Sequence, residues 1–145
     1  MNLPKNALVL VADGRKLLFL RNQGDDKQMD LHLEAHQEQD NPPTREQGTD
    51  APGRSFSPGG RRSAMAETDF HQLEEDRFAA EAAALLRDRA LNGDFKTLVV
   101  VAPPRTLGEL RKHYHKEVAA RIVQELHKDL TGFSVDDIEA ALIRA

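Results

Sequence analysis

The segment that decides the fold of this chain is Thr97-Leu98-Val99-Val100-Val101-Ala102-Pro103-Pro104-Arg105-Thr106-Leu107-Gly108-Glu109-Leu110. Its first half is an unbroken run of β-branched and aliphatic residues, which is typical of a strand covered on both faces inside a partly parallel sheet. Pro103 and Pro104 cannot donate hydrogen bonds to a neighbouring strand, so the strand should end there. Thr106 and Glu109 have the spacing of a capping box, which predicts that a helix begins at Thr106.

This junction places the start of a helix at the carboxyl edge of the sheet, where open α/β sheets commonly bind ligands. Free backbone N–H groups at a helix start favour anions, and Arg105 lies beside them. Arg105 and Thr106 are therefore candidate binding residues. The same pattern also fits an ordinary capped helix with a solvated arginine, so it does not identify a ligand.

The first part of the chain predicts an antiparallel meander of three strands. Residues 7–12 and 16–21 are apolar runs joined by Asp13-Gly14-Arg15, and Asp-Gly between such runs is a strong hairpin signal. Residues 29–33 alternate between apolar and polar side chains, as in a strand with one wet face. The histidine pairs His32/His36 and His113/His115 lack the ligand number and geometry of a metal site, and we expect neither a bound metal nor another cofactor.

The second part predicts helices around the central strand. Apolar residues recur at helical spacing over 67–91, and Asn92-Gly93 should cap that helix. A helix from Thr106 to about Val123 follows, then a short fifth strand within 124–131, for which a helical interpretation also works. Ser134 should cap a last helix. The resulting order, β-β-β-α-β-α-β-α, predicts one α/β domain over residues 1–145, with a mixed five-strand sheet and a ribonuclease H-like motif.

Composition limits the classes of function. The chain has 145 residues, of which 39% are hydrophobic, and a formal net charge of −4, which argues against a generally basic surface that coats nucleic acid. It contains no cysteine, so disulfides and thiolate chemistry are excluded. The short apolar run near the N-terminus is neither a signal-peptide core nor a membrane span. We therefore expect a cytoplasmic protein that does not enter a membrane.

Residues 38–66 have a different composition, rich in Pro, Gly, Ser and Arg and without apolar periodicity. This pattern predicts a long loop. The loop concentrates Arg45, Arg54, Arg61 and Arg62 on an otherwise acidic chain, which suits a phosphate backbone or an acidic partner. The alternative is a disordered, solvated loop without a partner.

Several segments together carry a family resemblance. Leu8-Val9-Leu10-Val11-Ala12-Asp13-Gly14-Arg15, Gly48-Thr49-Asp50-Ala51-Pro52-Gly53-Arg54, the run Leu98 to Arg111 and Lys128-Asp129-Leu130-Thr131 resemble the bacterial host-attachment protein family, described as required for attachment to host cells. That family in turn is similar to the middle domain of archaeal and eukaryotic class-1 peptide-chain release factors. In those factors a Gly-Gly-Gln loop precedes a long helix and reaches the peptidyl-transferase centre. Here the matching residues are Gly59-Gly60-Arg61, with arginine in place of glutamine.

Three functions remain open. The preferred one is a non-catalytic cytoplasmic interaction protein of the host-attachment family that acts indirectly through an unidentified protein partner. The alternative is a factor that binds RNA or the ribosome through the arginine loop. The weaker third is a metal-dependent phosphoesterase, for which Asp13 could supply one carboxylate, although Ala102-Pro103-Pro104 stands where another acid is needed. We expect no catalytic residue, and the candidate binding residues are Arg54, Gly59, Gly60, Arg61, Arg62, Arg105 and Thr106.

Overall fold

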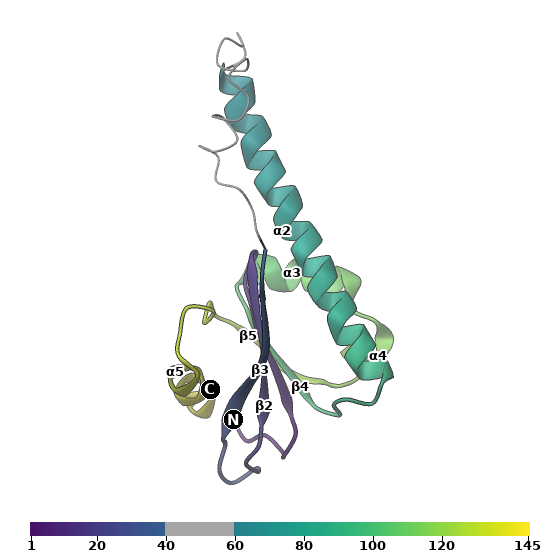
Figure 1. Ribbon diagram of the computed structural model, residues 1–145, viewed down its shortest axis with the longest axis vertical. Helices are drawn as coiled ribbons and strands as arrows, with labels where there is room; N and C mark the ends of the chain where they lie inside the picture. Colours follow the sequence, from purple (N-terminus) through teal and green to yellow (C-terminus); the bar gives the residue numbers. More distant parts are fainter. Residues whose placement is uncertain (40–59) are drawn as a thin grey trace.

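The computed structural model describes residues 1–39 and 60–145, and of residues 60–68 only the backbone path. It confirms a single α/β domain with a mixed five-strand sheet (Figure 1). The strands are β1 Leu8–Ala12, β2 Lys16–Asn22, β3 Leu31–Glu38, β4 Leu98–Ala102 and β5 Ile122–His127. Their order is β3-β2-β1-β4-β5, in which β1 pairs antiparallel with β2 and parallel with β4, and β5 is parallel to β4.

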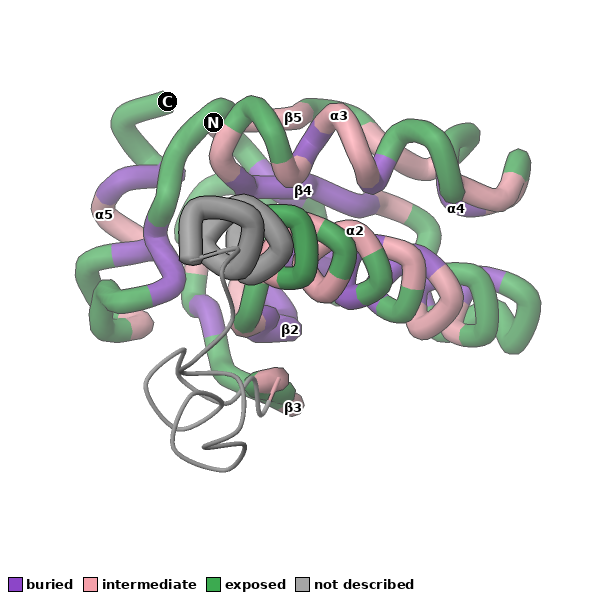
Figure 2. The backbone as a smooth tube through the Cα atoms, turned by 90° about the horizontal axis from the view of Figure 1, so that it is seen from above, coloured by how far each residue is buried: buried purple, intermediate pink, exposed green. Residues whose placement is uncertain are grey.

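The described part of the chain holds four helices, which cover both faces of the sheet. They are α2 Gly60–Leu91, α3 Pro104–His113, α4 Lys116–Ala119 and α5 Val135–Arg144. Helices α2 and α3 lie over one face and α5 lies over the other (Figures 1 and 2). None of the described helices is both long enough and apolar enough to span a membrane.

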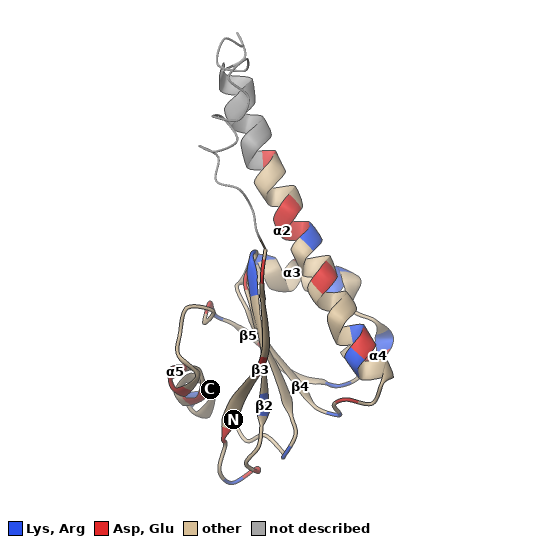
Figure 3. Cartoon of the chain, in the orientation of Figure 1, with Lys and Arg blue, Asp and Glu red and all other residues tan. Residues whose placement is uncertain are grey.

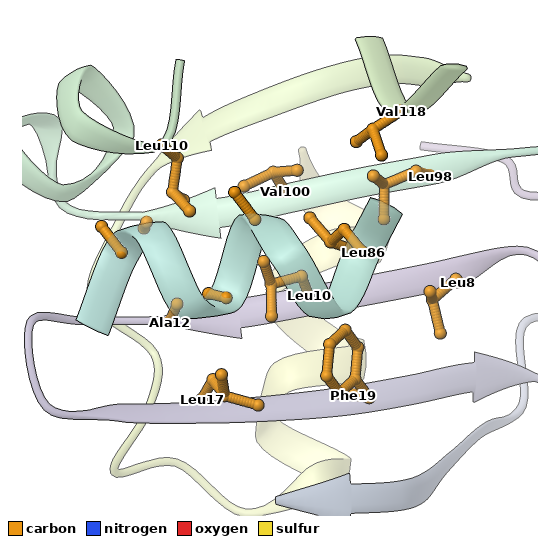
Figure 4. Packing of buried hydrophobic residues seen from close by; sticks show 14 of the residues in the cluster. Leu8, Leu10, Ala12, Leu17, Phe19, Leu86, Leu98, Val100, Leu110 and Val118 are labelled. Atoms are coloured by element: carbon orange, nitrogen blue, oxygen red, sulfur yellow. The ribbon is translucent and has the colours of Figure 1, made fainter. Parts of the chain in front are cut away.

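Strand β4 is the buried centre that the sequence predicts, since all five of its residues are inaccessible to solvent. Its side chains alternate between two apolar clusters. Leu98 and Val100 point toward α2, where they meet Leu86 and the β1 residue Leu10 (Figure 4), whereas Val99 lies in the cluster beneath α5. A strand covered in this way needs no polar face, which explains the unbroken aliphatic run.

The predicted hairpin between β1 and β2 is confirmed. The Asp13 carboxylate accepts hydrogen bonds from the backbone N–H groups of Arg15 and Lys16, both at 2.7 Å, and closes the turn. The third strand lies later than the predicted 29–33. It runs to Glu38 because its backbone pairs with the whole of β2, although only Leu31 among its residues is buried. Side-chain alternation therefore could not show where this edge strand ends.

The structure corrects the start of the longest helix. Helix α2 begins at Gly60 rather than at residue 67, so residues 60–66 are helical and not part of a loop. The high helix propensity of the Ala, Arg and Met residues in this stretch accounts for the extension. The other end is as predicted, since Gly93 has φ 69°, the left-handed conformation that suits a glycine cap. Residues 40–59, the remainder of the predicted loop apart from its first two residues, lie outside the described residues.

Among the α2 residues whose burial is described, those from 69 to 91, the buried side chains lie in the C-terminal half of the helix. They are Phe78, Ala79, Ala82, Ala83, Leu86 and Ala90. Helix α2 therefore continues past the edge of the sheet, as Figure 1 shows. At ~1.5 Å per residue, the first residue of the helix lies roughly 27 Å from the first buried one.

The prediction that Thr106 caps α3 is wrong. The helix begins at Pro104, with Pro103 as the N-cap residue and no hydrogen bond from a capping side chain. Proline at the first helical position is favourable because its φ is already helical and its missing N–H needs no partner. Thr106 is consequently the third residue of the helix.

The predicted continuation of this helix to about Val123 is also wrong. Helix α3 ends at His113, the backbone becomes extended at Tyr114 (ψ 128°), and β5 already begins at Ile122. The apolar i, i+4 spacing does not reflect one continuous helix. Val118 is buried as part of the separate short helix α4, and Ile122 packs against the core as part of a strand. The fifth strand is confirmed, at 122–127 instead of 124–131. Ser134 caps α5 as predicted, accepting a hydrogen bond from the Asp137 N–H at 3.1 Å.

Candidate functional site

A cavity of about 330 Å³ lies at the carboxyl edge of the three parallel strands, between the turn after β1, helix α2 and the start of α3. Two of the predicted binding residues, Arg105 and Thr106, line it. The rest of its lining is Asp13, Gly14, Arg15, Gln72, Glu75, Asp76, Ala79, Pro103, Glu109 and Asp129. The cavity is therefore assembled from four segments that are distant in the sequence.

The first turn of α3 contributes backbone donors that have no partner within the described part of the chain. The first hydrogen bond of the helix runs from the Leu107 N–H to the Pro103 carbonyl at 2.9 Å, so the N–H groups of Arg105 and Thr106 precede the ladder. The Arg105 side chain is exposed and makes no ion pair or hydrogen bond within the described part of the chain. These donors alone would favour an anion.

Carboxylates oppose that preference. Five of them line the same cavity: Asp13, Glu75, Asp76, Glu109 and Asp129. The acidic character continues along α2, where red positions mark its middle in Figure 3. A phosphate backbone laid along this face would meet repulsion from five of the six other charged side chains that line the cavity with Arg105.

Asp13 is held in place by structural hydrogen bonds. One of its oxygens accepts the two turn amides described above, and the other accepts a hydrogen bond from the Thr131 hydroxyl at 2.8 Å. The same hydroxyl lies 3.0 Å from Asp129. Asp13 thus ties the end of β1 to the segment after β5. Among the residues that the structure describes, no group of three His, Asp and Glu side chains is arranged to hold a metal ion.

The other predicted binding residues lie elsewhere. Gly60, Arg61 and Arg62 form the first turn of α2, whereas Arg54 and Gly59 fall outside the described residues. Gln72, the first α2 residue at the cavity, is 12 residues beyond Gly60, a separation of ~18 Å along the helix. The fold therefore does not bring the helix start and the Arg105 edge together.

Sequence reasoning missed a buried ionic cluster at the opposite edge of the sheet. Arg21 is only 8% exposed. Its guanidinium donates to Glu34 at 3.0 Å and 3.1 Å, to Asp94 at 2.7 Å, and to the carbonyls of Asn6 and Asp94. Arg89 donates to the same two carboxylates. The one available signal was a charged residue within the apolar run of β2.

These contacts shift the ionisation of the cluster. Hydrogen bonds from Arg21, with help from Arg89, lower the pKa of Glu34 despite its partial burial. Burial alone would raise the pKa of Asp94, but hydrogen bonds and the positive charges of both arginines outweigh it and lower that pKa. Both carboxylates therefore remain ionised and committed to the arginines.

Comparison with models of known protein families identifies the family of this chain. The model of bacterial archaeo-eukaryotic release factor family 12 matches residues 6–142. The chain belongs to this family. No curated protein matches it. The relation to release factors predicted from the sequence is confirmed, but the family match contains nothing on host attachment, so that part of the resemblance has no support.

Proposed function

We propose that this protein is a ribosome-associated factor that contacts ribosomal RNA through the first turn of α2. Membership of a release-factor family supports a role related to the ribosome or RNA. The observation that carries the proposal is the projection of α2: the helix starts at Gly60 and continues past the edge of the sheet (Figure 1), and among its residues with described burial, from 69 on, the first buried one is Phe78. Burial from Phe78 onward anchors the helix, so its first turn can reach a partner beyond the domain.

The charge pattern restricts the contact to the start of the helix. Arg61 and Arg62 supply two positive charges there, whereas Glu74, Glu75 and Asp76 make the middle of α2 acidic. Only the first turn can therefore approach phosphates without repulsion. The proposal leaves Arg105 out of the RNA contact because carboxylates surround it.

The residue at the glutamine position indicates the kind of activity. Release factors carry Gly-Gly-Gln before their long helix, and this chain carries Gly59-Gly60-Arg61. Arginine replaces an uncharged amide by a permanent cation, which suits phosphate binding. We therefore propose cytoplasmic binding to the ribosome without hydrolysis of peptidyl-tRNA. An effect on attachment to host cells would then be an indirect consequence.

Co-sedimentation with purified bacterial ribosomes at several salt concentrations tests the proposal. Binding should weaken as salt rises, by a logarithmic slope of about −0.7 for each phosphate contact to single-stranded RNA. The double variant R61A/R62A should bind more weakly and flatten the slope by ~1.4. Its matched control is K128A/R144A, which removes the same charge from two exposed positions outside α2, and R105A serves as a second control.

Three outcomes would contradict the proposal. The wild-type protein could fail to sediment with ribosomes even at ~50 mM salt, where electrostatic binding is strong. The control K128A/R144A could lose as much affinity as R61A/R62A, which would show that ribosome binding depends on overall positive charge and not on a contact at the start of α2. Finally, the wild-type protein could release peptide from ribosomes that hold a nascent chain, which would show that Arg61 permits hydrolysis.

A further inference from the structure

We propose that a second cavity, at the amino edge of the parallel strands, binds a phosphate group of a nucleotide-sized ligand. The cavity measures about 670 Å³ and lies where β1 and β4 begin, at the end of the domain opposite the Arg105 edge. It is lined by Lys5, Asn6, Ala7, Arg21, Gln23, Glu34, Gly93, Asp94, Phe95, Lys96 and Thr97. Its volume falls in the range of ~300–1,000 Å³ that is usual for small-ligand pockets.

The negative charges of this cavity are already neutralised. Glu34 and Asp94 each accept hydrogen bonds from Arg21 and Arg89, so two carboxylates face two guanidinium groups. Three carbonyl groups of the last turn of α2, those of Asp88, Arg89 and Ala90, accept hydrogen bonds from the N–H groups of Asn92, Asp94 and Gly93 at 2.9–3.1 Å. Both carboxylates are thus paired with arginines, and three carbonyls of the last turn of α2 are already bonded.

The remaining charges are positive. Lys5 and Lys96 line the cavity, are exposed, and make no ion pair or hydrogen bond within the described residues. They lie on different segments, one before β1 and one before β4, so the fold brings them to the same cavity. An anion that accepts from both would gain from two charges on a protein whose net charge is −4.

Uncharged donors complete the site. The side chains of Asn6, Gln23 and Thr97 line the cavity, and none of them makes a side-chain hydrogen bond within the part of the chain that the structure describes. Amide and hydroxyl donors beside two ammonium groups are the chemistry that recognises phosphate oxygens. The five donors converge from three separate segments.

The backbone at Asn6 has a fixed conformation beside the cavity. Asn6 has φ 72° and is the one described residue other than glycine in the left-handed region. Its N–H donates to the Asn22 carbonyl at 2.7 Å, and its own carbonyl accepts from Arg21 at 3.1 Å. The conformation is thus held from both sides, next to Lys5. Asparagine adopts the left-handed conformation more readily than other residues with a side chain, and these two hydrogen bonds hold Asn6 at the rim of the cavity.

Titration followed by NMR of backbone amides tests the site with three probes: inorganic phosphate, AMP, and a 5′-phosphorylated pentauridylate. We expect saturable shifts that are confined to residues 5–7, 23 and 93–97. Stronger binding of AMP would identify a free nucleotide as the source of the phosphate, and stronger binding of the oligonucleotide would identify RNA. No ribosome is present, so this site and the proposed ribosome contact can fail separately.

A variant without the two lysine charges, together with a matched control, tests whether these charges bind the phosphate. K5Q/K96Q should weaken binding at least tenfold, while K116Q/K128Q, which removes two exposed lysines outside the cavity, should bind as the wild type does. Thermal melts of both variants check that the fold is intact. The site is disproved if no probe gives saturable shifts at millimolar concentration, if K5Q/K96Q binds like the wild type, or if the control loses as much affinity.

Discussion

Replacing Arg21 by Met should destabilise the domain through loss of the ionic cluster. Methionine keeps most of the aliphatic stem and removes the guanidinium. Arg21 is 8% exposed and donates to two carboxylates and two carbonyls, which then lose their shared donor. The substitution therefore separates the contribution of the charge from that of packing.

The size of the expected loss in stability depends on how far the arginine and the carboxylates of the ion pairs are buried. Breaking a fully buried ion pair costs ~3–5 kcal/mol, because the remaining charge stays buried and unpaired. Here the side chains of Glu34 and Asp94 are 33% and 38% exposed and can regain water. We therefore expect the free energy of unfolding to fall by roughly 2–3 kcal/mol, which is at or below the lower end of that range. In a domain of this size the melting temperature should fall by about 4–12 °C.

The pH dependence gives a second, independent measurement. The pKa values of Glu34 and Asp94 are lowered in the folded protein, so their stabilising effect is present above the unfolded values of about 4 and is lost as the pH falls through the folded ones. The difference in unfolding free energy between wild type and R21M should therefore shrink as the pH falls from ~5 toward ~2. Urea denaturation followed by circular dichroism at each pH measures it.

A difference that stays constant from pH 7 to the acid range would refute the reasoning, because it would show that Arg21 acts through packing alone. The control is R144M, at an exposed arginine near the end of α5. R144M should change the free energy of unfolding by no more than ~0.5 kcal/mol at every pH.

Three further predictions concern the core and the helix ends. V100D should prevent folding, since an unpaired carboxylate inside the sheet costs several kcal/mol against a total of roughly 5–15 kcal/mol; an unchanged cooperative melt would show that β4 is not central. S134A should cost ~1 kcal/mol by urea denaturation, and S134N, which can still cap α5, should cost much less. G93A should cost ~1–2 kcal/mol because residue 93 has positive φ, whereas G108A, in α3 with open space around the added methyl group, should be neutral or stabilising by up to ~1 kcal/mol. Equal effects of the two glycine substitutions would contradict the assignment of Gly93 as the cap.

Short-range rules in the sequence were sufficient for the sheet and for several element ends. The aliphatic run ending at Pro103, the Asp13 turn, the Gly93 cap and the Ser134 cap each depend on a few neighbouring residues, and the structure confirms all four. The same rules failed where two local signals competed. Pro104 begins α3 although Thr106 and Glu109 have the spacing of a capping box, because a proline at the first helical position needs no capping partner there.

The sequence by itself determined the α/β class, the mixed five-strand sheet and the relation to release factors. The tertiary structure decided which half of α2 is buried, where the chain leaves α3 to form β5, and which residues share a cavity. Lys5 and Lys96 are 91 residues apart and line one cavity because β1 and β4 are parallel neighbours that begin at the same edge. Arg21, Glu34 and Asp94 likewise come from three separate segments: β2, β3 and the connection between α2 and β4. Such groupings depend on strand order and register, which local patterns of hydrophobicity do not encode.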